Sequence, residues 1–353
     1  MTEKNENLRL QERLKEFRNA FPNSDDFSVE NIDNKHVRIL NRLKNEGGID
    51  SINLGNLRNW SMQSDMGTSR MFYIKLPLSL KALEKLLNLL LGNLYLNFRS
   101  KSMKKSINDD INFLKLKNSY DVLLENPVSK TPGITQWFTD GRTTYNLRWI
   151  RYVYLMGRIK EESLLNNDST WVDIGSFYGG LQSISYRYFP NVKYVMVDFH
   201  HQLFRSYLYL TEMYPDSKHI FGGKNVLDSK GAAFCYVPVE EFHEINQINC
   251  DLLSNFFSFG EMKREYFNTY LNSKTLLDAK IIYNVNRFVS SPFFEPTYDS
   301  DLTLLDYKFE NHKISYLDVF PIHHFQTIKR ELLGIKRHRN TSSSYFEMIS
   351  RKM

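Results

Sequence analysis

The segment from residue 171 to residue 199 constrains the fold more than any other part of this sequence. An apolar run, Trp171–Ile174, precedes a turn that contains Gly175, Gly179 and Gly180, and a second apolar run ends at Asp198. Strand, glycine turn, helix and second strand, in this order, are typical of a βαβ unit. In such a unit a ligand lies across the carboxyl ends of the parallel strands, and an acid about 20 residues after the turn binds its ribose. We therefore expect a site for a ribose-containing ligand at these strand ends.

Phe177 decides which ligand fits this turn. A dinucleotide requires glycine at the second position of G-x-G-x-x-G, because only then does the backbone approach the pyrophosphate closely. This chain has Phe177 at that position. S-adenosylmethionine (AdoMet) has adenine and ribose but no phosphate, and the Asp198 carboxylate can accept hydrogen bonds from both ribose hydroxyls. The segment favours AdoMet over NAD; the alternative is that the glycines only connect a strand to a helix in another α/β protein.

Length and residue usage set the organisation that we expect. A chain of 353 residues exceeds a typical single domain. We expect a mainly helical region at 1–125, which would bind an acceptor or form a homodimer, and an α/β domain at 126–353. The polar N-terminus and the charged residues that interrupt 82–98 predict neither a signal peptide nor a transmembrane segment. Cys235 and Cys250 form no disulfide framework or metal cluster, so a cytoplasmic protein is expected.

Most of the net charge of +6 lies at the C-terminal end. Residues 329–353 contain seven Lys or Arg residues and two Glu residues. Such a tail could contact an anionic membrane peripherally, a nucleic acid, or an acidic glycan or phosphate substrate. The alternative is a solvated loop, which we favour because the basic residues do not alternate with aromatic ones as in RNA-binding segments. No DNA binding is expected.

Strands and helices alternate from residue 170 onward, which predicts a layered α/β domain. The predicted strands are 170–174, 193–198, 233–237, 249–255, 279–285, 314–320 and 344–351. The predicted helices are 180–188, 201–213 and 261–272, preceded by an amphipathic helix at 4–20 and an aromatic, arginine-rich helix at 144–160. The last two strands lack a full crossover connection, so we expect an antiparallel pair at the sheet edge. Seven strands with a terminal antiparallel hairpin is the plan of class I AdoMet-dependent methyltransferases.

The sequence resembles the bacterial sugar O-methyltransferases, a family of class I AdoMet-dependent enzymes, over roughly residues 125–290. The resemblance rests on four segments: the glycine turn 173–180, the strand end 194–198, the run Asp251–Met262, and the helix segment Arg148–Tyr154. It implies a Rossmann-like sheet, AdoMet as cofactor, and methylation of a sugar hydroxyl of a bacterial surface polysaccharide or its precursor. Phe177 departs from the family pattern, which usually has glycine there.

The candidate site residues follow from the rule that ligands bind at the carboxyl ends of the strands in this fold. For the cofactor they are Asp173, Gly175, Ser176, Tyr178, Gly179, Asp198, Phe199, Pro238, Val239 and Asn255. For the acceptor they are Arg148, Arg151, Asn286 and Arg287. A general base would come from His323, His324 or Glu261. Ordinary strand-end packing, a helix-start carboxylate and surface histidines are the alternative interpretations. The Asp299/Asp301 pair is a weak metal signal, so we predict no metal residues, and a requirement for a divalent metal stays open.

Three other functions compete with this interpretation. The acceptor could be another small molecule or an RNA base, although the segment at Asn255 lacks the prolines of an Asn-Pro-Pro-Tyr motif for amino-group methylation. An NAD-dependent oxidoreductase is weakened by Phe177. A non-catalytic scaffold with a degenerate methyltransferase fold would result if the Phe177 ring filled the pocket for the methionine part of AdoMet.

Overall fold

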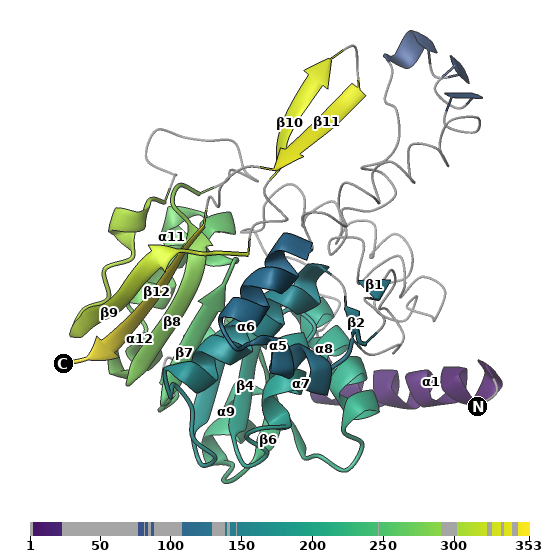
Figure 1. Cartoon of the computed structure of the whole chain (residues 1–353). Coiled ribbons are helices and arrows are strands. Elements are labelled where there is room, and N and C mark those ends of the chain that lie inside the picture. The colour runs from purple at the N-terminus through teal and green to yellow at the C-terminus, as the bar shows by residue number, and fades with distance from the viewer. Residues whose placement is uncertain are drawn as a thin grey trace.

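The computed structural model contains a mixed eight-stranded sheet with helices packed around it (Figure 1). It describes residues 3–22, 77–80, 82–83, 86–87, 108–128, 138–139, 142–145, 147–245, 247–290, 302–322, 327–332, 335–340 and 345–353.

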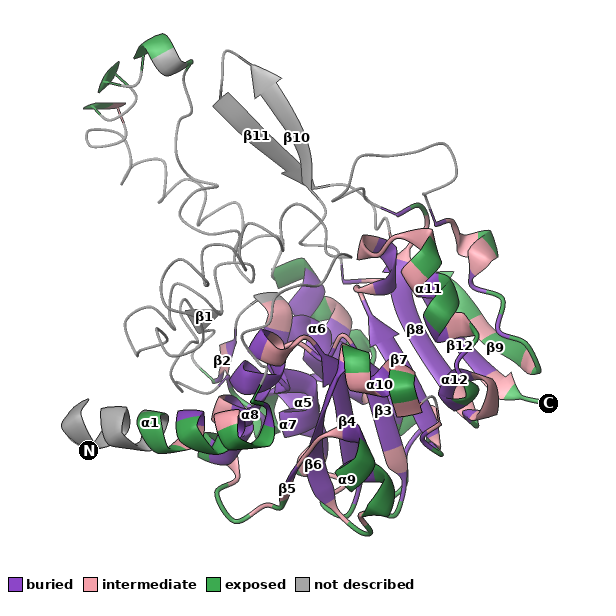
Figure 2. Cartoon of the chain, turned by 180° about the vertical axis from the view of Figure 1, so that it is seen from behind, coloured by how far each residue is buried: buried purple, intermediate pink, exposed green. Residues whose placement is uncertain are grey.

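The order of the strands in the sheet is β5-β6-β4-β3-β7-β8-β12-β9. Their bounds are β3 (Thr170–Ile174), β4 (Lys193–Asp198), β5 (His219–Phe221), β6 (Ala233–Pro238), β7 (Leu252–Phe256), β8 (Ile281–Arg287), β9 (His312–Val319) and β12 (Tyr345–Lys352). The strands from β5 to β8 are parallel, whereas β12 runs antiparallel to both β8 and β9. The central strands are buried along almost their whole length, as expected for parallel strands covered on both faces (Figure 2).

Helices cover both faces of the sheet. One face packs against α5 (Tyr120–Glu125), α6 (Leu147–Glu161), α7 (Gly180–Tyr186) and α8 (His200–Met213). The other face packs against α10 (Val239–Ile245), α11 (Arg264–Leu271) and α12 (Lys274–Asp278), with α9 (Gly223–Asp228) beside β5 and β6. Each face of the sheet has its own hydrophobic core, because successive side chains of a strand point to opposite faces. In β3, Trp171 packs in the first core and Val172 in the second.

Smaller elements complete the described chain. These are α1 (Glu3–Ala20), the strand pairs β1 (Phe138–Thr139) with β2 (Thr144–Tyr145) and β10 (Thr327–Leu332) with β11 (Ile335–Asn340), and the short helices η3 (Leu78–Leu80), η4 (Phe259–Glu261) and η5 (Leu304–Asp306). Helix α1 packs on α8, with the rings of Phe17 and Phe204 5.1 Å apart. The division at residue 125 stays a prediction, although both α1 and α5 share the core of the sheet domain.

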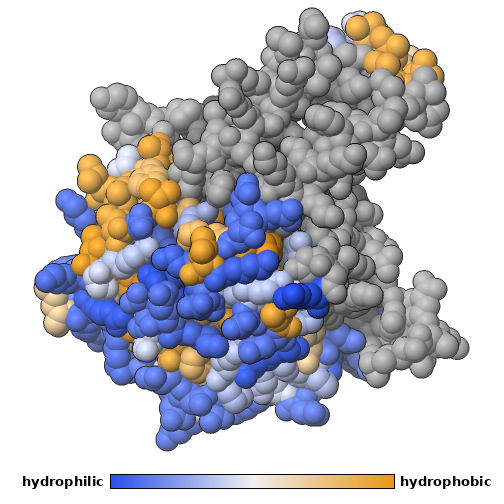
Figure 3. Space-filling view, viewed as in Figure 1, coloured by the Kyte–Doolittle hydropathy of each residue, from blue (hydrophilic) through white to orange (hydrophobic). Residues whose placement is uncertain are grey.

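The predicted α/β architecture and its terminal antiparallel strands are confirmed, but the prediction of seven strands is wrong. The sheet has eight strands because β5 forms an additional parallel edge beside β6. It has only three residues, too few to produce a recognisable alternation of apolar and polar side chains. No helix in the described part of the chain is long and apolar enough to cross a membrane. The described surface in Figure 3 is largely hydrophilic, with apolar side chains exposed on β9 at Ile314, Leu317 and Val319.

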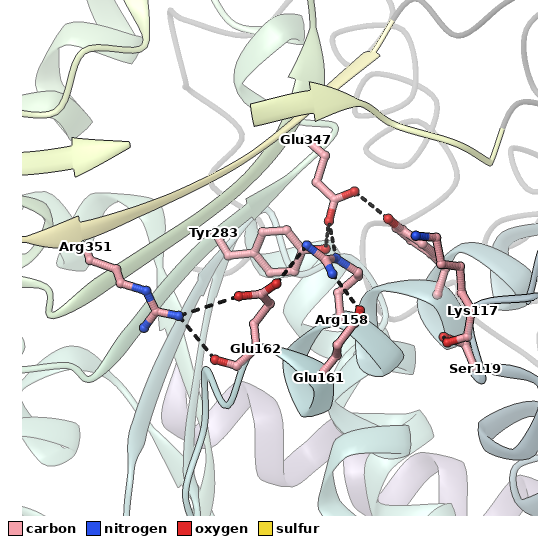
Figure 4. Close-up of polar contacts among 9 residues, drawn as sticks. Lys117, Ser119, Arg158, Glu161, Glu162, Tyr283, Glu347 and Arg351 are labelled. Atoms are coloured by element: carbon pink, nitrogen blue, oxygen red, sulfur yellow. Dashed lines mark hydrogen bonds and ion pairs between the residues drawn. The ribbon is translucent and has the colours of Figure 1, made fainter. Parts of the chain in front are cut away.

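A buried ionic cluster fixes α6 against the sheet (Figure 4). Glu347 of β12 is fully buried and accepts hydrogen bonds from Tyr154 Oη at 2.6 Å, Tyr283 Oη at 2.7 Å and Arg158 Nε at 3.2 Å. Arg158 also forms an ion pair with Glu161. These contacts hold the C-terminal half of α6, so its N-terminal half is positioned above the carboxyl ends of the central strands.

Candidate active site

A pocket lies at the carboxyl ends of β3 and β7, beneath the N-terminal turns of α6. Its lining residues are Arg148, Arg151, Tyr152, Asp173, Gly175, Ser176, Phe177, Leu181, Phe256 and Phe257. The structure therefore brings together the glycine turn after β3 and the two arginines that the sequence suggested for the acceptor.

Asp173, one residue before the end of β3, is the buried acid of this pocket. Its carboxylate accepts hydrogen bonds from Ser254 Oγ at 2.5 Å and Gln182 Nε2 at 2.6 Å, and Trp171 Nε1 donates to Ser254 Oγ at 2.7 Å. Both direct donors are neutral. Burial raises the pKa of Asp173 to about 7, although these two hydrogen bonds oppose the shift.

Asp198 ends β4 and organises the glycine turn. One carboxylate oxygen accepts the backbone N–H of Phe177 at 2.8 Å, and the other accepts that of Phe199 at 2.8 Å. Phe177 has a positive φ of 56°, which few non-glycine residues adopt, and its carbonyl accepts the Ser206 hydroxyl at 2.6 Å. Because a carboxylate oxygen can accept more than one hydrogen bond, ribose hydroxyls can add to these backbone donors.

Asn255 and Asn286 hold the turn that follows β7. Both side chains are fully buried. Asn255 donates to the carbonyl of Ile174 at 2.8 Å, and its own side-chain oxygen accepts the amide of Asn286 at 2.9 Å. Asn286 in turn accepts the backbone N–H of Gly260 at 3.0 Å. These hydrogen bonds give both residues a role in shaping the loop; their contact with a cofactor or acceptor stays a prediction.

Gly175 leaves room for a neighbouring loop. A Cβ at this position would lie 2.2 Å from the hydroxyl of Ser258, and the φ of Gly175 is +77°. The absence of a side chain is therefore explained by the close approach of the loop after β7. Direct contact between Gly175 and a cofactor stays a prediction.

Three arginines surround two phenylalanine rings at the pocket. The Arg148 guanidinium lies 4.2 Å from the centre of the Phe177 ring, and that of Arg205 lies 5.6 Å from the same ring. Arg151 lies 4.5 Å from the centre of the Phe257 ring. Burial and the neighbouring Arg148 lower the pKa of Arg151 to about 9. Burial likewise lowers the pKa of Arg205 to about 9, although Asp198 opposes this.

The remaining predicted cofactor residues lie around the same strand ends. Tyr178 packs in the aromatic core, with its ring centre 5.0 Å from that of Tyr209, and Gly179 is the N-cap of α7. Phe199 stacks on His201 with ring centres 5.9 Å apart. Pro238 ends β6 directly beside Asp198. Ser176 is buried in the pocket lining, and Val239 begins α10. Their cofactor contacts stay predictions.

The predicted acceptor and base residues have different outcomes. Glu261 belongs to η4 and lies near enough to Arg151 to favour its charged form. Arg287, at the end of β8, lies 5.1 Å from the Tyr345 ring. His323, His324, Asp299 and Asp301 lie outside the described residues. Within the described ranges, no group of three or more His, Cys, Asp or Glu side chains is arranged to hold a metal ion.

Sequence reasoning missed Arg205 and the Ser254–Gln182 pair. Arg205 comes from α8, and its proximity to Phe177 depends on how that helix packs. Ser254 was inside a predicted strand, where alternation alone indicated only that one face is buried. Its register position beside Asp173 was the available signal, since adjacent parallel strands bring such residues together.

Comparisons with known proteins find similarity at the level of solved structures. No family model matches the chain, and no curated protein matches it. The mitomycin 7-O-methyltransferase MmcR is 10% identical, with 58% of this chain and 57% of that chain covered and a TM-score of 0.32. The pyocyanin biosynthetic protein PhzM is 11% identical, with 58% of each chain covered and a TM-score of 0.32.

In a third similar structure, the match extends over almost the whole of the other protein. A Pyrococcus horikoshii protein provisionally named an RNA methyltransferase is 12% identical, with 67% of this chain and 98% of that chain covered and a TM-score of 0.38. Similarities of this size identify neither a family nor an acceptor. The strand order of the sheet and the geometry at its carboxyl edge therefore carry the functional argument.

Proposed function

We propose that this protein is an AdoMet-dependent methyltransferase. The observation that carries the proposal is the position of Asp198: a carboxylate at the end of β4, joined by a hydrogen bond to the glycine turn that follows the neighbouring strand β3. This is where a Rossmann-like sheet binds the ribose of its ligand. AdoMet, when bound, supplies a methyl group on a sulfonium.

The charges and unsatisfied groups of the pocket suit the amino-acid end of AdoMet. Asp173 is buried with neutral hydrogen-bond donors, so a cationic ammonium would stabilise its charged form. In the described structure, the buried Ser176 hydroxyl and the Gln182 side-chain carbonyl have no hydrogen-bond partner. Both can bind a polar ligand. Phe177 would keep the backbone away from a pyrophosphate, but AdoMet has no pyrophosphate, so this residue is compatible with AdoMet.

For the acceptor we propose a sugar hydroxyl, in a bacterial surface polysaccharide or its precursor. This part of the proposal is supported by the sequence resemblance at Asp251–Met262 and by the aromatic and arginine side chains in the pocket lining. The residues around the pocket must hold the acceptor oxygen in line with the methyl group, and one of them must accept the proton of the acceptor hydroxyl. Glu261 or one of the histidines His323 and His324 would take the proton.

There are two alternatives to this proposal. Phe177 lines the pocket, so a scaffold whose Phe177 ring excludes the cofactor is the non-catalytic alternative. The second alternative is a methyltransferase with a different acceptor, either another small molecule or RNA. Such an enzyme would bind AdoMet at the same site and would differ only in the residues that bind the acceptor.

The cofactor assignment can be tested by calorimetric titration with S-adenosylhomocysteine, with NADH as the control ligand. Asp198→Asn should weaken binding at least about tenfold. The matched control is Asp251→Asn, because Asp251 also accepts a backbone N–H, that of Thr170 at 2.8 Å, but at the opposite end of β3. Undiminished binding in Asp198→Asn would remove the ribose assignment. Folded protein that binds neither ligand would favour the scaffold.

A further inference from the structure

Strand β9 is an edge strand of the eight-stranded sheet, next to β12 (Figure 1). No strand of the described chain pairs with its outer side, so this side presents backbone N–H and C=O groups for pairing. Three aliphatic side chains of β9, those of Ile314, Leu317 and Val319, are 47%, 45% and 47% exposed. Aliphatic side chains in a row on an edge strand favour pairing with another chain.

A β-bulge in β9 places these three side chains on one face of the sheet. The register with β12 shifts by one residue at Ser315, which is the additional residue of the bulge. In a regular strand Ile314 and Leu317, three residues apart, would point to opposite faces. Because the bulge takes up one residue, both point to the same face, as does Val319 two residues further along the strand.

The backbone groups of alternate β9 residues point away from β12. The N–H of Phe320 donates to the carbonyl of Tyr345 at 2.9 Å, and that of Met353 donates to the carbonyl of Asn311 at 3.0 Å. These bonds place Phe320 and Asn311 at hydrogen-bonded positions of the ladder, and such positions alternate along an antiparallel strand. Outside the bulge, the β9 residues whose backbone groups face outward are therefore His312, Ile314, Leu317 and Val319.

One antiparallel register matches β9 to β9 of a second copy. In this register Ile314 lies opposite Leu317 of the second chain, and the backbone groups of both residues face outward. The same register places Lys313 opposite Asp318, and these two exposed side chains have opposite charges. Two-fold symmetry forms each of these pairs twice. A shift by one residue would instead place Ile314 opposite the Asp318 carboxylate.

The bulge makes this register selective for a second copy. Side chains that lie opposite each other in paired strands must point to the same face. Ile314 and Leu317 are an odd number of residues apart, as are Lys313 and Asp318, so a regular strand could not pair with itself in this way. The pairing is possible because both chains have the additional residue Ser315, whose hydroxyl donates to the carbonyl of Ile349 at 3.2 Å.

Asp318 already has contacts within its own chain. Its carboxylate accepts the backbone N–H of Val319 at 2.7 Å and interacts with the Tyr316 hydroxyl. In the paired strands, the Val319 N–H would donate to a carbonyl of the second chain, so the carboxylate could bind Lys313 without leaving that N–H unbonded. Exposed ion pairs contribute little to affinity. The backbone and aliphatic contacts would therefore supply the affinity, and the charges would select the register.

We propose that β9 pairs with β9 of a second copy of this chain, so that the two sheets join into one continuous sheet with two-fold symmetry. Because the two β9 strands are antiparallel, the parallel strands of the two chains run in opposite directions. The two candidate active sites then lie at opposite edges of the joined sheet, so pairing leaves both accessible. The alternative is that the bulge and Lys313 only protect the edge, in which case the protein is a monomer.

Sedimentation-velocity centrifugation of the full chain over a series of concentrations measures the pairing. We expect a species with twice the mass of one chain, in reversible equilibrium with the monomer. Leu317→Lys should raise the dissociation constant about a hundredfold, because the symmetry places a charge in both aliphatic contacts. The matched control is Leu227→Lys, since Leu227 is 47% exposed in α9, beside β5 at the opposite edge of the sheet, and should leave the constant unchanged. A monomer at every concentration, or a dimer that persists in Leu317→Lys, would overturn the proposal.

Charge reversal tests the register. Lys313→Asp should weaken the dimer about tenfold, because two carboxylates then face each other at both ends of the paired strands. Adding Asp318→Lys to the same chain places opposite charges together again and should restore the dissociation constant. A double variant that associates no better than Lys313→Asp would overturn the proposed register. Both residues are exposed, so circular dichroism and binding of S-adenosylhomocysteine should be unchanged in these variants.

Discussion

Two buried carboxylates in this protein, Glu347 and Asp173, have opposite surroundings. Glu347 is bound by two tyrosine hydroxyls and by Arg158, so its charge is balanced inside the protein. Asp173 is bound by a serine hydroxyl and a glutamine amide, both neutral. Burial raises the pKa of both groups, and at Glu347 the charge of Arg158 opposes that shift.

The position of each acid explains the difference. Glu347 lies within β12 and accepts a hydrogen bond from Arg158 of α6, so it joins that helix to the sheet (Figure 4). Asp173 lies near the end of β3 and lines the pocket. A structural acid requires its counter-charge in every molecule, whereas an acid in a ligand site can receive it from the ligand. A strongly shifted pKa in a pocket is therefore a functional signal only when the local hydrogen bonds are considered with it.

The largest expected effect is on stability, at Glu347. Glu347→Ala leaves Arg158 without its buried partner and should lower the free energy of unfolding by about 3–5 kcal/mol. Urea denaturation followed by circular dichroism measures this change. The control is Glu161→Ala, which removes the half-exposed partner of the same arginine and should cost about 0–1 kcal/mol. Equal costs for the two variants would show that the buried cluster is no more stabilising than a surface ion pair.

Asp173→Asn should give the reverse pattern. Asparagine removes a buried charge, so folding stability should not fall by more than about 1 kcal/mol, the size of one hydrogen bond. Binding of S-adenosylhomocysteine should weaken at least about tenfold at pH 8, because the ammonium group loses its counter-charge. Thermal unfolding and calorimetry on the same preparation measure both. A variant that is destabilised but binds normally would make Asp173 a structural acid like Glu347.

The pH dependence of binding tests the same contrast. Because the pKa of Asp173 is raised to about 7 from an ordinary value of 3.8, the folded protein holds a proton there that the unfolded chain has lost. This contribution to stability decreases as pH rises through that interval, since the native state binds more protons. Ligand affinity should change in the opposite direction, rising from pH 6 towards pH 8 and then levelling.

Proton release gives a direct readout of this titration. At pH 6, binding of S-adenosylhomocysteine should ionise Asp173, so the observed heat should depend on the ionisation enthalpy of the buffer. Asp173→Asn should abolish this dependence. A dependence that persists in the variant would assign the proton to another group.

The sequence allowed prediction of the site residues that lie at the ends of recognisable strands. Buried parallel strands are continuous apolar runs, so β3, β4 and β6 were located to within a residue, and Asp198 follows from the end of such a run. Residues brought together by packing were not predictable in this way. Arg205 and Gln182 come from helices and contact the pocket residues Phe177 and Asp173. Glu347 is an isolated acid in a strand that could equally face solvent. Asn255 and Asn286 were both named as candidates from their places at strand ends, but the hydrogen bond between them required knowledge that β7 and β8 are neighbours.

The smallest expected effect concerns Phe177, the residue on which the scaffold alternative depends. Phe177 and Phe257 both have positive φ, 56° and 69°, and each carries an arginine on its ring. Glycine at 177 would relieve about 1–2 kcal/mol of left-handed strain but would lose a cation–π contact of similar size. Affinity for S-adenosylhomocysteine should therefore change by less than about threefold, which is below ~1 kcal/mol.

Phe257→Gly is the matched control for this variant, because Phe257 also lines the pocket, has positive φ and lies against an arginine. Calorimetric titration of both variants separates the two functions. If Phe177→Gly alone raises the affinity by about tenfold or more, the wild-type ring obstructs the methionine pocket. In that case the Phe177 ring would exclude the ligand from Asp173, although the neutral hydrogen-bond donors around this acid would still suit a cationic ligand. Similar, small changes in both variants would leave Phe177 as a support for Arg148, with the pocket open to the cofactor.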